Sequence, residues 1–197
     1  SALAPANYLA LNPVARDRFL ETEGRSLLDG FRNLLDDLER GDGRLDINMT
    51  DRQAFEVGRD LAITEGQVIW QNELMQLIHY APLTETQFKR PLLFVPPWIN
   101  KYYIFDMKPE NSMVRFMLEQ GHSVFLISWV NPTKEHAALS FEDYMRLGPL
   151  EALDKVEEAT GEKEFDILGF CIGGILVTAT LAYMAAKGDK RVKTATT

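Results

Sequence analysis

The sequence predicts an α/β fold in which a mixed, mostly parallel sheet carries helices on both faces. Short apolar runs alternate with amphipathic segments over the second half of the chain, as expected for strands buried in a parallel sheet. Two strand-like segments precede them and predict a hairpin, which makes the sheet mixed. The last complete apolar run passes through a glycine-rich turn directly into a helix.

Composition narrows the class of protein before any motif is considered. The chain has 197 residues, of which 46% are hydrophobic and 25% charged, and this profile is typical of a soluble globular chain. Its net charge of -8 gives no basic surface for a nucleic-acid partner. The start has no signal-peptide pattern, and the apolar runs are too short for a membrane span. We therefore expect a cytoplasmic protein.

Residues 1–66 are expected to form a helical N-terminal region. Asn12 can cap a helix that begins at Pro13, and apolar residues then recur at helical spacing, with Gly24 as a weak interruption. A Gly-Asp-Gly segment ends this pattern, and a second short helix is possible over 52–63. The region either covers the sheet as a helical layer or forms a contact with a partner or a second copy.

Residues 67–197 are expected to form the first part of the catalytic domain. The first predicted elements are a hairpin over 67–71 and 73–81 with an Asn72-Glu73 turn, a strand in 91–97 and a helix over 112–119 that Gly121 ends. A strand over 123–129 follows, and then a helix over 141–161 that is broken around Gly148-Pro149. The last predicted elements are a strand over 165–170, a helix over 172–186 and the start of a strand over 191–197. A sheet that stops at this point is incomplete.

The strongest motif is the turn Gly-Phe-Cys-Ile-Gly-Gly, in which the chain's single cysteine, Cys171, follows a strand and precedes a helix. Small residues two before and two after a nucleophile are typical of the nucleophile elbow, with Cys in place of Ser. Small residues at these two positions avoid steric collisions at a sharp, strained turn. The motif predicts an α/β-hydrolase fold, incomplete in this chain, rather than a structural cysteine or a nucleotide-binding turn.

The predicted chemistry is nucleophilic catalysis. A helix N-terminus favours the thiolate of Cys171, and the backbone N–H of Ile172 faces the same space. A second oxyanion donor is expected from Ile99 or Asn100, in the loop after the first buried strand. Trp98 and Phe170 adjoin these positions and are candidates for the wall of the substrate pocket, although such aromatic residues often belong to the core.

The remaining members of a catalytic triad are not found after Cys171. In this fold an acid and then a histidine follow the nucleophile, but here only Asp189 follows, in a turn expected to be solvated. The three histidines all precede Cys171 and are expected to be structural or at the surface; they are His79, His122 and His136.

Three further charged residues near the strand ends are not expected to be catalytic. Lys101 and Asp106 are predicted to be structural ion partners, and Asp166 a solvated residue at a strand end. No metal-ligand spacing appears, so neither a metal nor another cofactor is expected.

Two segments, PPWINKYYI and GFCIGG, are the most specific parts of a resemblance that extends over nearly all 197 residues. In these segments and beyond them the chain resembles the class I polyhydroxyalkanoate synthases. Val130, where the family commonly has Arg, is a departure that puts one polar contact in doubt. The resemblance implies that the substrate is (R)-3-hydroxyacyl-CoA, a short one such as 3-hydroxybutyryl-CoA. It also implies that Cys171 carries the acyl group as a thioester while the substrate is polymerised and CoA is released.

The resemblance also implies partners. These are the growing polyester chain, a second copy in a homodimer, and a remainder of the polypeptide that carries the Asp and His. It implies a location on the surface of polymer granules. Two other functions stay open from the residues alone. A cysteine-type α/β-hydrolase would act on small esters or lactones, and a non-catalytic interaction module would use the helical N-terminal third.

Overall fold

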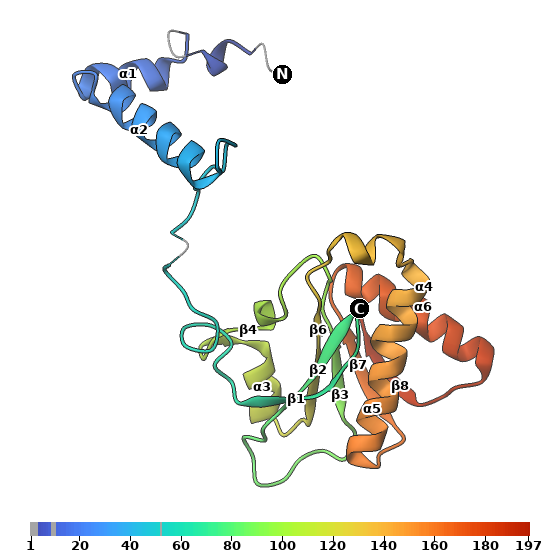
Figure 1. Ribbon diagram of the computed structural model, residues 1–197. Coiled ribbons are helices and arrows are strands. Elements are labelled where there is room, and N and C mark those ends of the chain that lie inside the picture. Colours follow the sequence, from blue (N-terminus) through green and yellow to red (C-terminus); the bar gives the residue numbers. More distant parts are fainter. Residues whose placement is uncertain (1–3, 9–10, 52) are drawn as a thin grey trace. The chain divides into compact units, whose positions relative to one another are not determined.

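The computed structural model describes residues 4–8, 11–51 and 53–197. The chain divides into two compact units, Ser1–Ala54 and Phe55–Thr197, and each is described by itself (Figure 1). Residues 55–65 therefore group with the sheet, whereas the sequence assigned them to the helical region. The predicted division into domains 1–66 and 67–197 stays a prediction.

The first unit contains a 3-10 turn, Pro5–Asn7, and two helices, α1 (Pro13–Glu21) and α2 (Arg25–Arg40). The cap predicted for α1 is confirmed, because Asn12 Oδ1 accepts a hydrogen bond from the N–H of Ala15 at 3.2 Å. Gly24 does more than weaken one helix. Its φ of +83° lies in the left-handed region, which glycine tolerates, and it separates α1 from α2.

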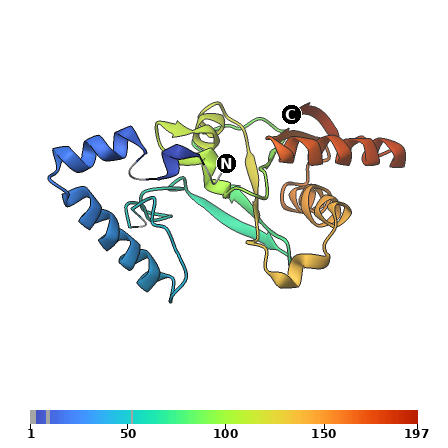
Figure 2. The same ribbon diagram turned by 90° about the horizontal axis from the view of Figure 1, so that it is seen from above.

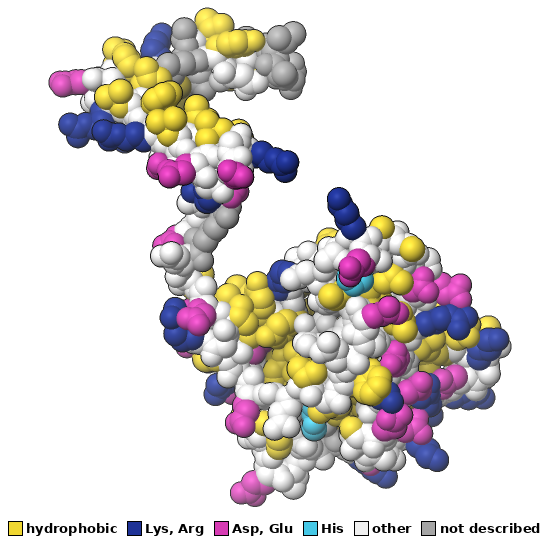
Figure 3. All heavy atoms as spheres, viewed as in Figure 1, with side chains coloured by type: hydrophobic (Ala, Val, Ile, Leu, Met, Phe, Trp, Pro, Cys, Tyr) yellow, Lys and Arg dark blue, Asp and Glu magenta, His cyan; other side chains and the backbone are white. Residues whose placement is uncertain are grey.

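Neither helix of the first unit contains a buried residue. Figure 3 shows hydrophobic side chains gathered along this unit. Those exposed on α2 are Leu27, Leu28, Phe31, Leu34 and Leu35. An apolar face of this kind normally packs against something. Whether it covers the sheet or contacts a partner stays a prediction.

The helix predicted near 52–63 is wrong for residues 53–63, which form turns and a single bridge between Val57 and Leu61. Positive φ angles at Gly58 and Ala62 interrupt any helix there. The segment is instead attached to the sheet unit, because the N–H of Ala62 donates to the carbonyl of Asp106 at 2.8 Å.

The second unit is built on a six-stranded sheet in the order β1-β2-β6-β3-β7-β8. The pairs β1·β2 and β2·β6 are antiparallel, and the other three are parallel. The strands are β1 (Gly66–Gln71), β2 (Met75–Tyr80), β3 (Leu92–Val95), β6 (Val124–Trp129), β7 (Phe165–Gly169) and β8 (Val192–Thr196). The predicted hairpin and mixed sheet are confirmed, and the fold is that of a partial α/β-hydrolase.

Apolar side chains fill both faces of this sheet. Leu93 and Val95 of β3 belong to one buried cluster, and Leu92 and Phe94 belong to the other. The first cluster packs under α4 (Phe141–Met145), α5 (Glu151–Thr160) and α6 (Ile172–Lys187), and the second under α3 (Met113–Glu119). Figures 1 and 2 show α3 on one side of the sheet and α5 and α6 on the other.

Several local features complete the unit. A small ribbon that the sequence did not predict pairs β4 (Asp106–Lys108) with β5 (Asn111–Ser112). The 3-10 helices are Tyr102–Phe105 and Lys134–Ala138. A π-helical turn, Arg146–Leu150, joins α4 to α5 at the predicted break, with non-helical angles at Gly148. None of the helices in the described residues is long and apolar enough to cross a bilayer.

Candidate active site

Cys171 lies between the end of β7 at Gly169 and the start of α6 at Ile172. Its φ and ψ are 57° and -123°, a conformation that non-glycine residues rarely adopt. The residue is exposed to solvent. Because α6 begins at Ile172, its N–H is among the first N–H groups of the helix, which have no acceptor within it. The predicted strained turn from strand to helix is confirmed.

The glycines around Cys171 are needed because backbones approach closely. A Cβ on Gly173 would lie within 3.0 Å of the carbonyl oxygen of Val95, and one on Gly169 would lie 2.7 Å from the Cα of Gly174. Neither glycine has a positive φ. Their role is therefore to allow α6 to begin directly against β3 and β7, which is the steric reason expected from the sequence.

The loop that follows β3 begins beside this elbow. The parallel register pairs Val95 with Gly169, and the N–H of Phe170 donates to the carbonyl of Val95 at 3.3 Å. Parallel strands bring the loops at their carboxyl ends together, although more than seventy residues separate the two loops in the sequence. The carboxyl edge of the sheet therefore carries both Cys171 and the predicted oxyanion loop.

Within that loop the two predicted donors differ. The N–H of Asn100 donates to the carbonyl of Pro97 at 3.2 Å and closes a turn. The N–H of Asn100 is therefore engaged within the loop, and its assignment as an oxyanion donor stays a prediction. Ile99, whose side chain is exposed, stays a candidate for the second donor. At the start of the loop, the indole Nε1 of Trp129 donates to the carbonyl of Pro96 at 2.7 Å.

The two aromatic candidates lie on different faces of the sheet. Trp98 packs against the rings of Tyr144 and Trp129, with centroids 4.8 Å and 6.3 Å away. Phe170 is about half exposed and meets the ring of Phe105 edge-on at 5.6 Å. Trp98 is thus partly a core residue, whereas Phe170 presents much of its ring to solvent. Their role as pocket walls stays a prediction.

The contacts of the histidines do not bring them to Cys171. His79 stacks on Phe125 with ring centroids 4.2 Å apart, and burial lowers its pKa. His122 precedes β6 and lies beside the ring of Phe88. The Nδ1 of His136 accepts a hydrogen bond from the N–H of Thr133 at 3.0 Å. These contacts support the structural roles expected from the sequence.

Asp189 is not the solvated turn residue that the sequence predicted. It lies at the amino end of β8, and Arg191 Nη2 approaches its Oδ2 at 2.9 Å. Partial burial would raise the pKa of Asp189, but the hydrogen bonds and charge of Arg191 outweigh it and lower the pKa. Arg191 also bridges Asp154 at 2.7 Å and Glu157 at 3.2 Å, so Asp189 belongs to an ion-pair cluster.

The prediction for Asp166 also needs correction. Its carboxylate is largely buried and accepts hydrogen bonds from Arg90 at 3.0 Å and Thr194 at 2.6 Å, so it is not solvated. The reason is that β3 and β8 flank β7 at this point and bring these side chains to it.

Within the part of the chain that the structure describes, the contacts of Asp106 and Lys101 are hydrogen bonds rather than the predicted ion pairs. Asp106 is buried and accepts from the hydroxyls of Thr64 and Ser112, both at 2.6 Å. It therefore anchors the segment before β1. Lys101 Nζ donates to the amide oxygen of Asn131.

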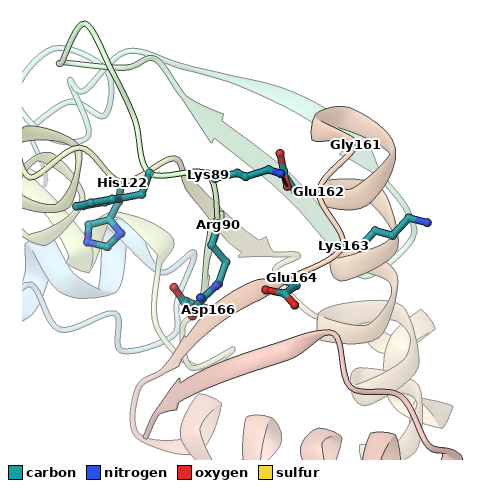
Figure 4. Close-up of a pocket in the computed structure, with 9 residues that line it drawn as sticks. Lys89, Arg90, His122, Gly161, Glu162, Lys163, Glu164 and Asp166 are labelled. Atoms are coloured by element: carbon teal, nitrogen blue, oxygen red, sulfur yellow. Dashed lines mark hydrogen bonds and ion pairs between the residues drawn. The ribbon is translucent and has the colours of Figure 1, made fainter.

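A hollow of about 800 Å³ lies at the amino ends of the parallel strands, shown in Figure 4. Phe88, Arg90, His122 and Asp166 are among its lining residues, and Arg90 points toward Asp166. Because Asp166 and Cys171 lie at opposite ends of β7, this hollow is separate from the nucleophile. Within residues 4–8, 11–51 and 53–197, no cluster of His, Cys, Asp and Glu side chains could hold a metal ion.

Comparison with known proteins finds relatives that are named poly(3-hydroxyalkanoate) polymerases. The chain is 50% identical over 196 residues to a poly(3-hydroxyalkanoate) polymerase of Methylorubrum extorquens, covering 100% of this chain and 32% of that protein. It is 47% identical to the poly(3-hydroxyalkanoate) polymerase subunit PhaC of Cupriavidus necator, covering 95% of this chain and 31% of that protein. The chain thus spans about a third of the length of the curated relatives it matches.

Among solved structures, a putative lipase from Sulfolobus solfataricus aligns with 66% of this chain and 48% of its own, at 13% identity and a TM-score of 0.47. The family described as "Poly-beta-hydroxybutyrate polymerase (PhaC) N-terminus" matches residues 1–117, more than half of the sequence. Cys171 lies outside this matched range but inside the matches to both polymerases, which extend over nearly the whole chain. The chain therefore belongs to the poly-β-hydroxybutyrate polymerase (PhaC) N-terminus family.

Proposed function

We propose that the whole protein is a polyester synthase, an acyltransferase that polymerises (R)-3-hydroxyacyl-CoA into polyhydroxyalkanoate and releases coenzyme A. The observation that carries this proposal is an exposed Cys171 on a strained elbow, in a chain whose relatives are named polymerases. A hydroxyacyl thioester supplies both an activated carbonyl and the hydroxyl for the next ester bond.

In the first step the Cys171 sulfur attacks the carbonyl carbon of the substrate. The carbon–sulfur bond to CoA breaks, CoA leaves as a thiol, and the acyl group stays on Cys171 as a thioester. The N–H groups of Ile172 and Ile99 are proposed to hold the oxygen that becomes negative during attack. One thioester replaces another, so the acyl group keeps its reactivity.

In the second step the 3-hydroxyl of another hydroxyacyl unit attacks the thioester on Cys171. The hydroxyl proton goes to a base, an ester bond forms, and the Cys171 sulfur is released for another cycle. The base and its orienting acid are proposed to lie in the remainder of the polypeptide. The engaged positions of His79, His122 and His136 support this assignment.

Finer features of the proposal rest on the resemblance to class I synthases. We propose a short substrate such as (R)-3-hydroxybutyryl-CoA, which the large rings of Trp98 and Phe170 near the elbow would suit. We also propose that the whole protein forms a homodimer and acts at the surface of polymer granules.

The test uses the full-length protein with (R)-3-hydroxybutyryl-CoA and, for comparison, (R)-3-hydroxyoctanoyl-CoA. We expect CoA release with formation of high-mass polymer, faster from the shorter substrate. Cys171→Ala should abolish both signals with the fold retained, and Cys171→Ser should lose most of the rate because a hydroxyl is harder to deprotonate. Free 3-hydroxybutyrate in place of polymer would instead identify a cysteine-type hydrolase.

The 197-residue chain by itself provides a second test. It should label slowly with iodoacetamide at Cys171 but should not release CoA over many turnovers, because its three histidines have contacts elsewhere and are not placed to deprotonate the incoming hydroxyl. Steady turnover by this chain, purified free of other polypeptides, would mean that one of its own histidines acts as the base.

A further inference from the structure

The oxyanion loop is held at its first residue by a side chain from another strand. Trp129, at the end of β6, donates its indole N–H to the carbonyl of Pro96 at 2.7 Å. Pro96 and Pro97 have no N–H groups, so the start of the loop has few donors of its own. The carbonyl of Pro96 is therefore the group by which the rest of the unit can fix the direction of this loop.

The ring of Trp129 is itself held in place. A Cβ on Gly148 would lie within 3.0 Å of the Trp129 Cη2 atom, so only glycine leaves room for the ring. Tyr144 packs on the ring with centroids 5.4 Å apart, and Trp98 meets it edge-on. Both Tyr144 and Gly148 belong to the region where α4 joins α5, so residues of this junction contact the Trp129 ring.

The same carbonyl group also contacts the start of α6. A Cβ on Gly173 would lie 3.0 Å from both the carbon and the oxygen of the Pro96 carbonyl, so the backbone at Pro96 lies directly against the helix that begins at Ile172. The Pro96 carbonyl therefore contacts both α6 and Trp129. Any shift at Pro96 would move the N–H of Ile99 relative to the N–H of Ile172.

We propose that Trp129 is a positioning residue for the oxyanion hole, acting through the carbonyl of Pro96. This inference rests on the proposed function, because it requires Cys171 to form an acyl-enzyme. The indole N–H fixes the Pro96–Pro97 peptide plane, two peptide units before the one that carries the N–H of Ile99, and so acts on the distance between the two oxyanion donors. Trp129 itself need not touch the substrate.

The proposal predicts a defect in the chemical step rather than in binding. In the full-length protein, Trp129→Phe keeps an aromatic ring but removes the donor. We expect the single-turnover burst of CoA release and kcat to fall roughly 10- to 100-fold, less than the roughly 100- to 1,000-fold cost of losing an oxyanion donor outright, because the donor is misplaced rather than removed. The KM for (R)-3-hydroxybutyryl-CoA should change little.

A matched control is available in the same unit. Trp70 is also half-buried, packs against the same core cluster, and donates its indole N–H to Glu151 at 2.9 Å. Trp70→Phe removes an equivalent hydrogen bond away from the elbow. It should therefore leave the burst of CoA release unchanged.

Iodoacetamide labelling separates the oxyanion loop from the nucleophile, because alkylation of a thiolate forms no oxyanion. Trp129→Phe should label at the wild-type rate. Labelling that falls in parallel with acyl transfer would mean that the elbow itself has moved, and would overturn the proposal. A wild-type burst in Trp129→Phe would also overturn it. Polymer formation by Cys171→Ala would instead refute the proposed function on which it rests.

If the smaller phenyl ring disturbs folding, the tryptophan can be replaced by β-(3-benzothienyl)alanine, which keeps the bicyclic shape and lacks the N–H. The same loss of burst rate is expected from this residue at position 129. Full activity with the analogue would show that the hydrogen bond has no positioning role.

Discussion

The amino and carboxyl ends of the parallel strands differ in the contacts that are prominent there. At the amino edge, charged side chains pair with one another, as Arg90 does with Asp166 and Arg191 with Asp189. At the carboxyl edge, Cys171 has a strained backbone, and backbone groups are in direct contact around it. Ion pairs between side chains are prominent at the amino edge, and close approaches between backbones are prominent at the carboxyl edge.

This difference shows where the unit tolerates change. An ion pair between long side chains can adjust when one partner is altered, and exposed pairs contribute little stability. Contacts between backbones cannot adjust without moving a strand or a helix. Ligands of parallel α/β sheets bind outside the carboxyl ends of the strands, so the rigid edge is also the one suited to catalysis.

The largest effect is expected from adding a single methyl group at the carboxyl edge. Gly173→Ala places a Cβ within 3.0 Å of the Val95 carbonyl, and neither backbone can move freely. We expect a loss of about 3 kcal/mol of unfolding free energy and a loss of acyl transfer. Denaturant unfolding measures this directly. Gly30→Ala, where nothing lies within 4 Å, is the matched control and should be neutral or slightly stabilising.

A smaller effect, of unusual sign, is expected at the nucleophile. Glycine normally destabilises a protein relative to alanine, because it leaves the unfolded chain more freedom. At Cys171 the positive φ reverses this preference. We expect Cys171→Gly to be more stable than Cys171→Ala by about 1 kcal/mol, since strain of this kind costs on the order of 1–3 kcal/mol. An alanine variant that is the more stable of the two would show that the elbow carries no strain.

At the amino edge we expect a modest effect that depends on pH. Arg191→Met removes the partner of Asp189, Asp154 and Glu157 and should cost about 1 kcal/mol at pH 7, with acyl transfer retained. Because Arg191 lowers the pKa of Asp189 in the folded state, its contribution is present above the unfolded pKa and is lost as pH falls through the folded one.

The difference in stability between wild type and Arg191→Met should therefore shrink below about pH 4, near the unfolded pKa of an aspartate. Urea unfolding at pH 7 and at pH 3 measures it. A deficit that is equal at both values would mean that lost packing, rather than charge, explains the effect.

The smallest effect is expected from His79, which lies away from the elbow and stacks on Phe125. Because burial lowers its pKa, the unfolded state binds a proton more readily, and stability falls as pH drops below about 6.5. His79→Phe keeps the stacking and removes this dependence. Acyl transfer should be unchanged, and thermal unfolding at pH 7 and pH 5 should differ less than in wild type.

Most of the fold could be predicted from local pattern. The cap at Asn12, the break at Gly148-Pro149 and the strand-to-helix turn at Cys171 are all in the structure. Each depends on neighbours within a few residues, and such neighbours are visible in the sequence. Residues 53–63 and the β4–β5 ribbon are exceptions. The end of the first segment is bonded to Asp106, which is distant in the chain.

The candidate site also has features that depend on neighbouring residues and features that depend on distant ones. The identity of the nucleophile and the need for small residues beside it follow from steric requirements within one short motif, so the sequence by itself determined them. Long-range contacts decided other parts: that Trp129 holds Pro96, that Arg90 pairs with Asp166, and that Arg191 joins the Asp189 turn to Asp154 and Glu157. A hydrogen bond between distant residues depends on the register of strands and the packing of helices, which only the tertiary structure sets.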